Sequence, residues 1–264
     1  MNYIEYIFFI FGQISKSIKM PKHLSLLLIL FLVTFGCSKE KEAELNLKGQ
    51  IKGEVFLYDE FGKSNTEYQD VEIVALAGDS SNSAAIDESG NYQINELNTG
   101  TYKLVCTKPG YGTRIIQSLQ LIGGDLPIYF SFGIGQKSST TIHELQIEYI
   151  NSNRLKAKAI INHNYIKSDY WSPDPRIKVF LSLDPEVSFK NYETSGEFTT
   201  KAISGTQLEE TFNIRLNSYP SGSKVYAIAY GASNNYYRNW NTTINNYIFH
   251  DLGQASNRIS FIMP

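Results

Sequence analysis

Short apolar runs, rather than helical repeats, dominate the pattern of hydrophobic and polar positions after residue 44. No segment there keeps apolar residues at the i, i+3, i+4 and i+7 spacing that an amphipathic helix needs over three turns. Instead, runs rich in Val, Ile, Tyr, Thr and Phe alternate with clusters of Gly, Asn, Ser and Pro. Such a pattern is typical of short strands joined by turns. It predicts an all-β chain built from β-sandwiches.

The expected strands fall into two groups. In the first group they cover residues 48–57, 71–76, 83–94 as a hairpin, 97–105 and 125–132. In the second group they cover residues 144–150 and 155–161 as a hairpin, 177–183, 211–216, 224–230 and 259–262. A polar linker rich in Gly and Ser, residues 134–140, separates the groups. We therefore expect two tandem β-sandwich domains, residues 47–133 and 141–264.

A continuous apolar stretch precedes the strands. The 12 residues from 24 to 35 are apolar except for Ser25 and Thr34, and Lys22 lies just before them. A basic start, an apolar centre of this length and a small residue at its end form a secretory signal peptide. The stretch falls short of the roughly 20 residues that span a bilayer. We therefore expect an export signal over residues 20–36.

The end of this signal resembles the bacterial lipobox, in which a small residue precedes a cysteine that receives acyl chains. The matching residues are Thr34-Phe35-Gly36-Cys37, although Phe35 replaces the usual small residue. The resemblance implies that Cys37 is lipidated and begins a mature chain of 264 − 36 = 228 residues. Several acyl chains on one residue suffice for stable membrane anchoring. An ordinary signal peptide with an incidental cysteine is the alternative.

Two further segments complete the N-terminal region. The charged residues 38–42 resemble the short signal that sends Bacteroidetes lipoproteins to the cell surface, and a plain charged tether over residues 37–46 is the alternative. Residues 1–19 precede a complete signal that starts at Met20, so we expect a mis-called upstream extension rather than a long signal start. The expected location is the outer membrane, with a lipid anchor and the chain facing the exterior.

The first group of strands carries a family resemblance. An opening Gly-x-Val is followed by Asp-x-x-Gly-x-Tyr, Leu-x-x-Gly-Thr-Tyr-x-Leu and Gly-Tyr. This order resembles the carboxypeptidase regulatory-like, or transthyretin-like, domain over about 75 residues, and it implies a seven-stranded sandwich that serves as an accessory or binding module. The matching residues are Gly53, Val55, Asp87, Gly90, Tyr92, Leu97, Gly100, Thr101, Tyr102, Leu104, Gly110 and Tyr111.

The second group resembles the fibronectin type III signature in one stretch, although any immunoglobulin-like sandwich would fit as well. The stretch has Leu, then Pro-x-Gly, then Tyr and alternating small apolar residues. The matching residues are Leu216, Pro220, Gly222, Tyr226 and Ala229.

The net charge, the cysteines and the histidines argue against several classes of function. A net charge of −2 supplies no basic surface for nucleic acid. Cys106 has no second cysteine to pair with once Cys37 is lipidated, so we expect a small buried apolar residue. His143, His163 and His250 lack metal-site spacing, and there is no Gly-x-Ser-x-Gly motif. We therefore expect no metal, no cofactor and no enzyme, although a pair of glycosidase carboxylates stays open.

Two aromatic loops are the candidate binding residues. Residues 165–175 carry Tyr170 and Trp171, and residues 233–243 carry four further candidates. Rings beside amide, guanidinium and carboxylate groups suit sugars, and the same residue types dominate protein interfaces. The alternative is that the rings pack as a small satellite core at the end of the domain. The four candidates in the second loop are Tyr236, Tyr237, Arg238 and Trp240.

The sequence therefore predicts a non-catalytic, lipid-anchored protein of the cell envelope. It would act as a binding module for a glycan or for an outer-membrane protein partner, with the membrane contacted through its N-terminal lipid. The alternative is a structural or assembly subunit of an outer-membrane complex, in which the sandwiches are spacers.

Overall fold

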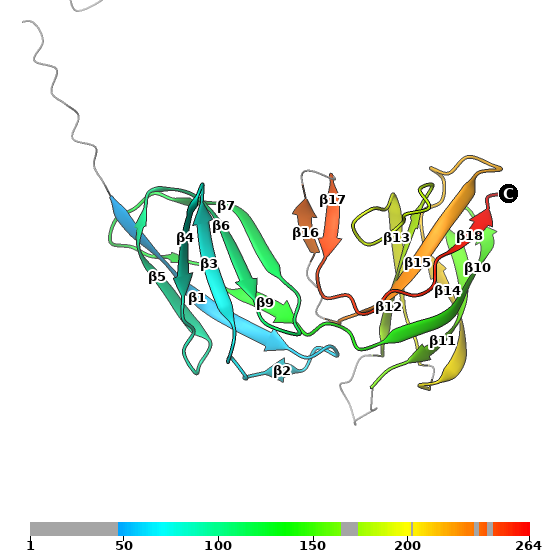
Figure 1. Ribbon diagram of the computed structural model, residues 1–264, viewed down its shortest axis with the longest axis horizontal. Coiled ribbons are helices and arrows are strands. Elements are labelled where there is room, and N and C mark those ends of the chain that lie inside the picture. The colour runs from blue at the N-terminus through cyan, green and yellow to red at the C-terminus, as the bar shows by residue number, and fades with distance from the viewer. Residues whose placement is uncertain (1–46, 165–173, 202, 235–237, 242–244) are drawn as a thin grey trace, which may run out of the picture. The chain divides into compact units, whose positions relative to one another are not determined.

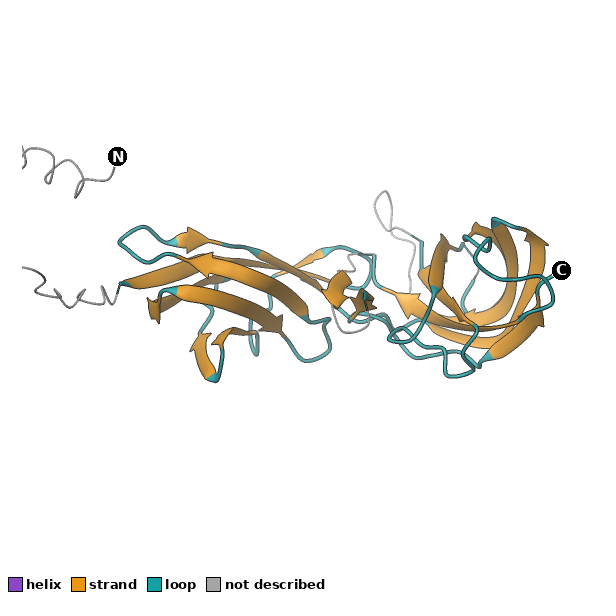
Figure 2. Cartoon of the chain, turned by 90° about the horizontal axis from the view of Figure 1, so that it is seen from above, coloured by secondary structure: helices purple, strands orange, loops and turns teal. Residues whose placement is uncertain are grey.

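The computed structural model describes residues 47–164, 174–201, 203–234, 238–241 and 245–264. These residues form strands and turns without a helix (Figures 1 and 2), so the all-β prediction is confirmed. Within these ranges there is accordingly no helix long and apolar enough to cross a membrane. Residues 1–46 lie outside the described part, so the signal peptide, the Cys37 lipid site and the tether stay predictions.

Two sheets form the first sandwich. One sheet has the order β2-β1-β5, and β8 and β9 pair in parallel with β1; the other has the order β4-β3-β6-β7. The strands of the first sheet are β1 (Lys48–Tyr58), β2 (Ser64–Asn65), β5 (Asn91–Asn98), β8 (Ile128–Tyr129) and β9 (Phe132–Gly135). Those of the second are β3 (Glu72–Ala77), β4 (Ser80–Ala84), β6 (Gly100–Thr107) and β7 (Arg114–Leu121).

The core of the first sandwich follows from strict alternation. Ile51, Val55 and Leu57 are buried on β1 while their neighbours face outward, and they share one core with Ile73 of the opposite sheet. Cys106 is also buried in this core, which confirms the prediction of a small buried apolar residue, and burial raises the pKa of its thiol to about 12.

Gly53 lets β1 come close to the chain between β8 and β9 in this sandwich. A Cβ at Gly53 would lie 1.8 Å from the carbonyl oxygen of Phe130, so any other residue would force the chains apart. The hydroxyl of Tyr92 donates a hydrogen bond to that same carbonyl. Gly53 and Tyr92, which both belong to the predicted family pattern, therefore hold the backbone at Phe130 in place.

The predicted hairpin over residues 83–94 forms only next to its turn, where Ile86 pairs antiparallel with Tyr92. Asp87 accepts hydrogen bonds from the backbone of Ser89 and Asn91, and Gly90 adopts a φ of 87°, so the predicted turn is present. However, β4 pairs with β3, whereas β5 pairs with β1. The chain therefore crosses at this turn from one sheet to the other, since β4 and β5 pair along their length with different strands.

Two further sheets form the second sandwich, with the orders β10-β11-β14 and β13-β12-β15-β18. Asn151 pairs with Arg154, which confirms the predicted hairpin between β10 and β11. The first sheet consists of β10 (Thr141–Asn151), β11 (Arg154–Asn162) and β14 (Thr206–Asn213). The second consists of β13 (Thr194–Thr199), β12 (Arg176–Ser182), β15 (Lys224–Ala232) and β18 (Ile259–Ile262).

Strands β12 and β15 are buried on both faces. On β12, Val179 faces the main core of the second sandwich, whereas Phe180 faces a separate aromatic cluster on the outer side of the sheet. The two-sided burial explains why these strands read as almost continuous apolar runs. The aromatic cluster consists of Phe180, Val187, Ile228, Tyr230, Ala232, Phe249 and Leu252, with Phe189, Tyr192, Tyr226 and Tyr247 packed against it.

The connection between the sandwiches is held by a buried carboxylate. Glu60 accepts hydrogen bonds from the backbone N–H of Ser139 at 2.7 Å and from its hydroxyl at 2.5 Å. Ser138 and Thr140 are buried beside it. A Cβ at Gly231 would lie 2.5 Å from the carbonyl oxygen of Thr140, so β15 also packs closely on this segment. The division into domains at residues 134–140 stays a prediction.

Candidate binding surface

The structure describes two of the six predicted binding residues. Arg238 and Trp240 lie on β16 (Arg238–Asn241), which pairs with β17 (Asn246–Phe249) to form a short hairpin. The other four lie outside the described residues, so the pairing of the two predicted loops stays a prediction. They are Tyr170, Trp171, Tyr236 and Tyr237.

One face of this hairpin is aromatic. Trp240 pairs across the strands with Tyr247, and their rings meet edge to face with centroids 5.0 Å apart. The guanidinium of Arg238 lies 4.3 Å from the centroid of the Tyr247 ring on the same face. Trp240 keeps 45% of its surface exposed. The hairpin thus presents an indole and a guanidinium at a fixed spacing, with Tyr247 between them.

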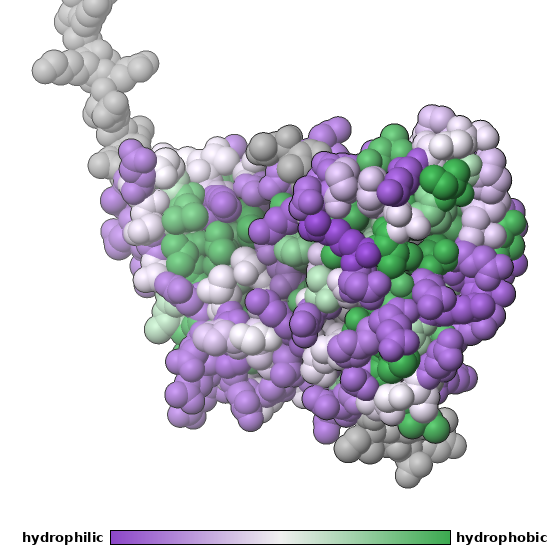
Figure 3. Space-filling model, turned by 45° about the vertical axis from the view of Figure 1, so that its right-hand side comes forward, coloured by the Kyte–Doolittle hydropathy of each residue, from purple (hydrophilic) through white to green (hydrophobic). Residues whose placement is uncertain are grey.

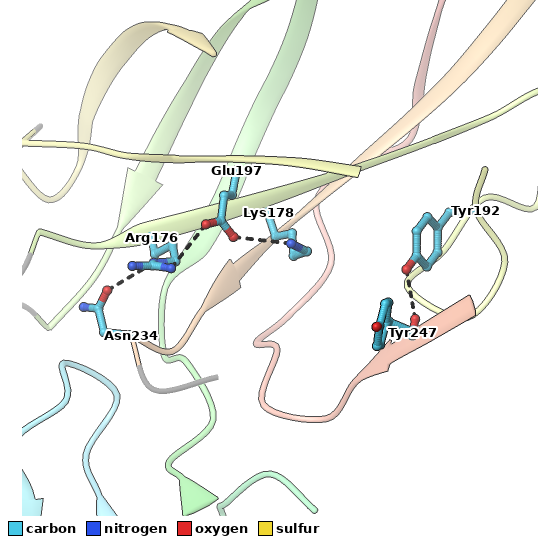
Figure 4. A network of polar contacts seen from close by, with 6 residues as sticks. All are labelled: Arg176, Lys178, Tyr192, Glu197, Asn234 and Tyr247. Carbon is cyan, nitrogen blue, oxygen red and sulfur yellow. Dashed lines mark hydrogen bonds and ion pairs between the residues drawn. The ribbon is translucent and has the colours of Figure 1, made fainter. Parts of the chain in front are cut away.

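The aromatic face rests on the cluster that covers β12 and β15. The Tyr192 hydroxyl donates to the carbonyl oxygen of Tyr247 at 2.9 Å, with Oδ1 of Asn246 at the same distance (Figure 4). Burial raises the pKa of Tyr192 to about 12, so this donor keeps its proton. Phe249 packs edge to face on Phe180, with centroids 5.6 Å apart. These contacts hold the base of the hairpin in place.

The opposite face of the hairpin contacts the first sandwich through Asn239. Its side-chain amide donates to the carbonyl oxygen of Thr113 at 3.0 Å, and its Oδ1 accepts from the N–H of Ile115 at 3.1 Å. Asn239 is buried, so both bonds lie away from water. A single side chain therefore satisfies two backbone groups at β7 and fixes the hairpin from its second side.

A partly buried ionic network lies beside the hairpin, with Lys178 as its buried member. Glu197 is 3.3 Å from both Arg176 and Lys178, and Arg176 also donates to Oδ1 of Asn234 at 3.3 Å (Figure 4). Burial lowers the pKa of Lys178, and the Lys178 amine lies 4.3 Å from the Phe249 ring. Glu197 bridges the two cations, and Lys178 connects the network to Phe249 at the base of the hairpin.

Asp251 is a buried acid just after β17. It is 2% exposed, and neither carboxylate oxygen has a hydrogen-bond partner among the described residues. Burial raises its pKa to about 7, against the opposing effect of Lys178 and Arg176. A Cβ at Gly112 would lie 2.9 Å from Cβ of Asp251, so the first sandwich packs directly on this acid.

The side chains of the β16–β17 hairpin suit binding of a ligand through aromatic rings. Over the described residues, no group of three His, Cys, Asp or Glu side chains could hold a metal ion. The accessible groups at the hairpin are an indole and a guanidinium, which can stack on a sugar face or pack into a protein pocket. A separate aromatic cluster that includes Phe180, Tyr230 and Phe249 packs beneath the hairpin, and Trp240 is not a member of it.

Sequence reasoning missed the supporting residues Tyr192, Tyr247 and Phe249. A signal existed for the last two, because residues 246–249 form a short β-type run directly after the second aromatic loop. Such a run would have predicted the strand that pairs with Trp240. Tyr192 carries no such signal, since its role depends on a contact 55 residues away in the chain.

Comparisons with known proteins give distant likenesses. No protein-family model matches the chain, and no curated protein matches it. A DUF3823 family protein from Bacteroides uniformis is 12% identical, over 82% of this chain and 100% of that one, with a TM-score of 0.31. A proposed carbohydrate-binding protein from the same species is 12% identical, over 81% and 99%, with a TM-score of 0.30.

A further likeness covers only part of the chain. A cohesin–X-dockerin complex from Acetivibrio cellulolyticus is 18% identical over 34% of this chain and 59% of that one, with a TM-score of 0.27. At TM-scores this low, the matches assign neither a family nor a ligand to this chain. The carboxypeptidase regulatory-like and fibronectin type III resemblances therefore stay predictions.

Proposed function

We propose that this chain is a non-catalytic binding module of the cell envelope, anchored by lipid on Cys37 and exposed at the outer surface. Its contact surface is the aromatic face of the β16–β17 hairpin, defined by Arg238, Trp240 and Tyr247. The ligand is a glycan or a protein partner at the outer membrane.

One observation carries the proposal, namely the exposure of Trp240 on a rigid base. A tryptophan that only filled a core would lose most of its exposed surface, yet Trp240 keeps 45% of it. Tyr247 and the aromatic cluster beneath hold the ring in place, so little side-chain freedom is lost when a ligand binds. The guanidinium of Arg238 on the same face adds a hydrogen-bond donor for hydroxyl or carboxylate groups.

The test is binding of the fragment Ser38–Pro264 to a broad glycan array and to outer-membrane extracts. Every strand of the described part lies within residues 48–262, so this fragment keeps the described fold. We expect binding that Trp240→Ala abolishes and that Phe56→Ala leaves unchanged. Phe56 is a matched control because it is a large ring, 44% exposed, on β1 of the first sandwich. Equal loss of binding in both variants, or in neither, would contradict a site at the hairpin.

The lipid anchor is tested separately. The full chain should sediment with membranes and incorporate labelled fatty acid, whereas Cys37→Ser should do neither. Protease added to whole cells should digest the anchored chain if it faces the exterior. Labelled fatty acid on the Cys37→Ser variant would overturn the anchor.

A structural role as a spacer or assembly subunit is the second candidate. The packing of seven rings in and against the aromatic cluster favours it, because those rings contribute to stability rather than to contact. A spacer would keep its partners in the Trp240→Ala variant, whereas a binding module would lose them.

A further inference from the structure

Three large aliphatic side chains are exposed together where the described chain begins. Ile122 and Leu126 are 81% and 87% exposed, the highest values for large apolar side chains in the described residues, and Leu47 is 43% exposed. Leu47 lies beside the loop that carries the other two, because a Cβ at Gly123 would lie 2.8 Å from Cβ of Leu47, and Ile122 and Leu126 both belong to this loop between β7 and β8. We name Leu47, Ile122 and Leu126 the aliphatic tip.

The backbone holds this tip in a defined shape. Gly123 and Gly124 have φ values of 77° and 100°, which other residues rarely adopt. The N–H of Gly124 donates to the carbonyl oxygen of Lys48 at 2.9 Å, and the Gln50 amide donates to that of Asp125 at 3.2 Å. The loop is therefore bonded to β1, and its aliphatic side chains point outward instead of folding back over the core.

Such a surface is unfavourable in water. Single exposed aliphatic residues are common, but a group of them on a fixed loop is a feature of contact sites. Much of the surface visible in Figure 3 is hydrophilic, with hydrophobic patches between. Lys48 and Asp125, which adjoin Leu47 and Leu126 in the sequence, carry opposite charges.

We propose that the aliphatic tip inserts into the lipid surface as a second membrane contact beside the anchor. The proposal rests on the lipid attached to Cys37 in the proposed function. Cys37 precedes Leu47 by 47 − 37 = 10 residues, and ten residues span at most about 35 Å even when fully extended. The anchor therefore keeps the tip within reach of the bilayer, where a tethered second contact forms at high effective concentration.

The first test measures directly whether the tip enters the lipid bilayer. The fragment Ser38–Pro264 with an N-terminal histidine tag is attached to vesicles of phosphatidylethanolamine and phosphatidylglycerol that contain a nickel-chelating lipid. A fluorophore on Leu126→Cys should shift to the blue and be quenched by nitroxide lipids. Cys106 is buried, so the label goes to the introduced cysteine. The same label on Ile203→Cys, a 76% exposed position near β14, should show neither effect.

The second test needs no tether. Co-sedimentation of the untagged fragment with the same vesicles should weaken by about tenfold or more in the double variant Ile122→Ser/Leu126→Ser. Ile203→Ser should leave it unchanged. Replacing phosphatidylglycerol by phosphatidylcholine should also change it little, because Lys48 and Asp125 carry opposite charges.

Three outcomes would overturn the proposal. They are equal quenching at positions 126 and 203, no quenching at position 126, and a fluorescence change that follows protein concentration without vesicles. The last would show that a second copy covers the tip. None of these three outcomes depends on lipidation, because the histidine tag replaces the acyl chains. None of them depends on Trp240 either. A failed anchor would instead appear in the Cys37→Ser fractionation.

Discussion

The β16–β17 hairpin and the aliphatic tip both expose large apolar side chains, but their surroundings differ. Trp240 meets a second ring and shares its face with a guanidinium, on a base fixed by Tyr192 and Asn239. The aliphatic tip has no ring, and Lys48 and Asp125, which adjoin it in the sequence, carry opposite charges. Rings and directed donors select a ligand by shape and hydrogen bonding. Aliphatic chains without donors select only an apolar environment.

The comparison shows that exposed apolar area alone does not indicate a function. The residues that pack against the exposed side chain decide whether the surface recognises one ligand or inserts into any apolar environment. The comparison depends on the base of the hairpin being rigid and on the aliphatic tip contributing nothing to folding. Each of these statements can be tested by the free energy of unfolding.

The largest expected effect is at the base of the hairpin. Phe180 contacts Tyr192, Tyr230 and Phe249 through ring centroids 4.8 to 5.6 Å apart. Phe180→Ala leaves a cavity beneath the hairpin and should lower the free energy of unfolding by about 3–5 kcal/mol. Denaturant unfolding measures this change. A loss below about 1 kcal/mol would mean that the cluster does not support the hairpin.

The second effect is a pH dependence set by Asp251. Its pKa is raised from 3.8 to about 7, so between these values the folded chain holds a proton that the unfolded chain has released. Stability should therefore fall as the pH rises from about 4 to about 7. Asp251→Asn should stabilise the protein by roughly 2–4 kcal/mol at about pH 8 and flatten the profile. Thermal unfolding across this range, with Asp125→Asn as the exposed control, measures it.

A smaller loss is expected at the contact with the first sandwich. Asn239→Leu leaves the carbonyl of Thr113 and the N–H of Ile115 without their present partners. Burying such groups unpaired costs about 1–3 kcal/mol. Hydrogen exchange at Ile115 should also become faster, since that amide loses its acceptor. Unchanged exchange would show that water replaces the asparagine without cost.

The smallest effects are expected at the two exposed surfaces themselves. Trp240→Ala should cost about 1 kcal/mol, because the ring loses one edge contact while about half of it was already in water. Ile122→Ser/Leu126→Ser should change the free energy of unfolding by less than about 0.5 kcal/mol. Both should be measured beside their binding assays. A large loss at the aliphatic tip would identify it as part of the core.

The sequence predicts the strands with clear alternation and misses those without it. Strand β11 alternates strictly and β10 does so from Leu145 onward, and their hairpin follows from the short polar turn between them. Strand β7 was missed because Ile115 and Ile116 are adjacent and break the period of two. The crossing at Asp87 was misread because a turn signal does not indicate which sheet the following strand joins.

The candidate site was predictable only in part. Arg238 and Trp240 stand out by composition, but their supporting residues come from β12, β15 and the chain around residues 189–192. Ile122 and Leu126 have no signal at all, because an apolar residue near a strand reads as core until its exposure is known. Contacts between distant segments and exposure at a surface are set by the tertiary fold, not by local sequence.

The parallel pairing of β9 with β1 has a mechanical consequence. Val55 to Tyr58 pair with Phe132 to Gly135 in the same direction. Tension applied between the start of β1, on the side of the proposed anchor, and the end of β9, which leads to the second sandwich, would slide these strands along each other. Sliding loads the hydrogen bonds of the pair together, whereas peeling would break them one after another. A ligand held at the hairpin against flow would thus pull on the first sandwich along the direction in which it resists shear.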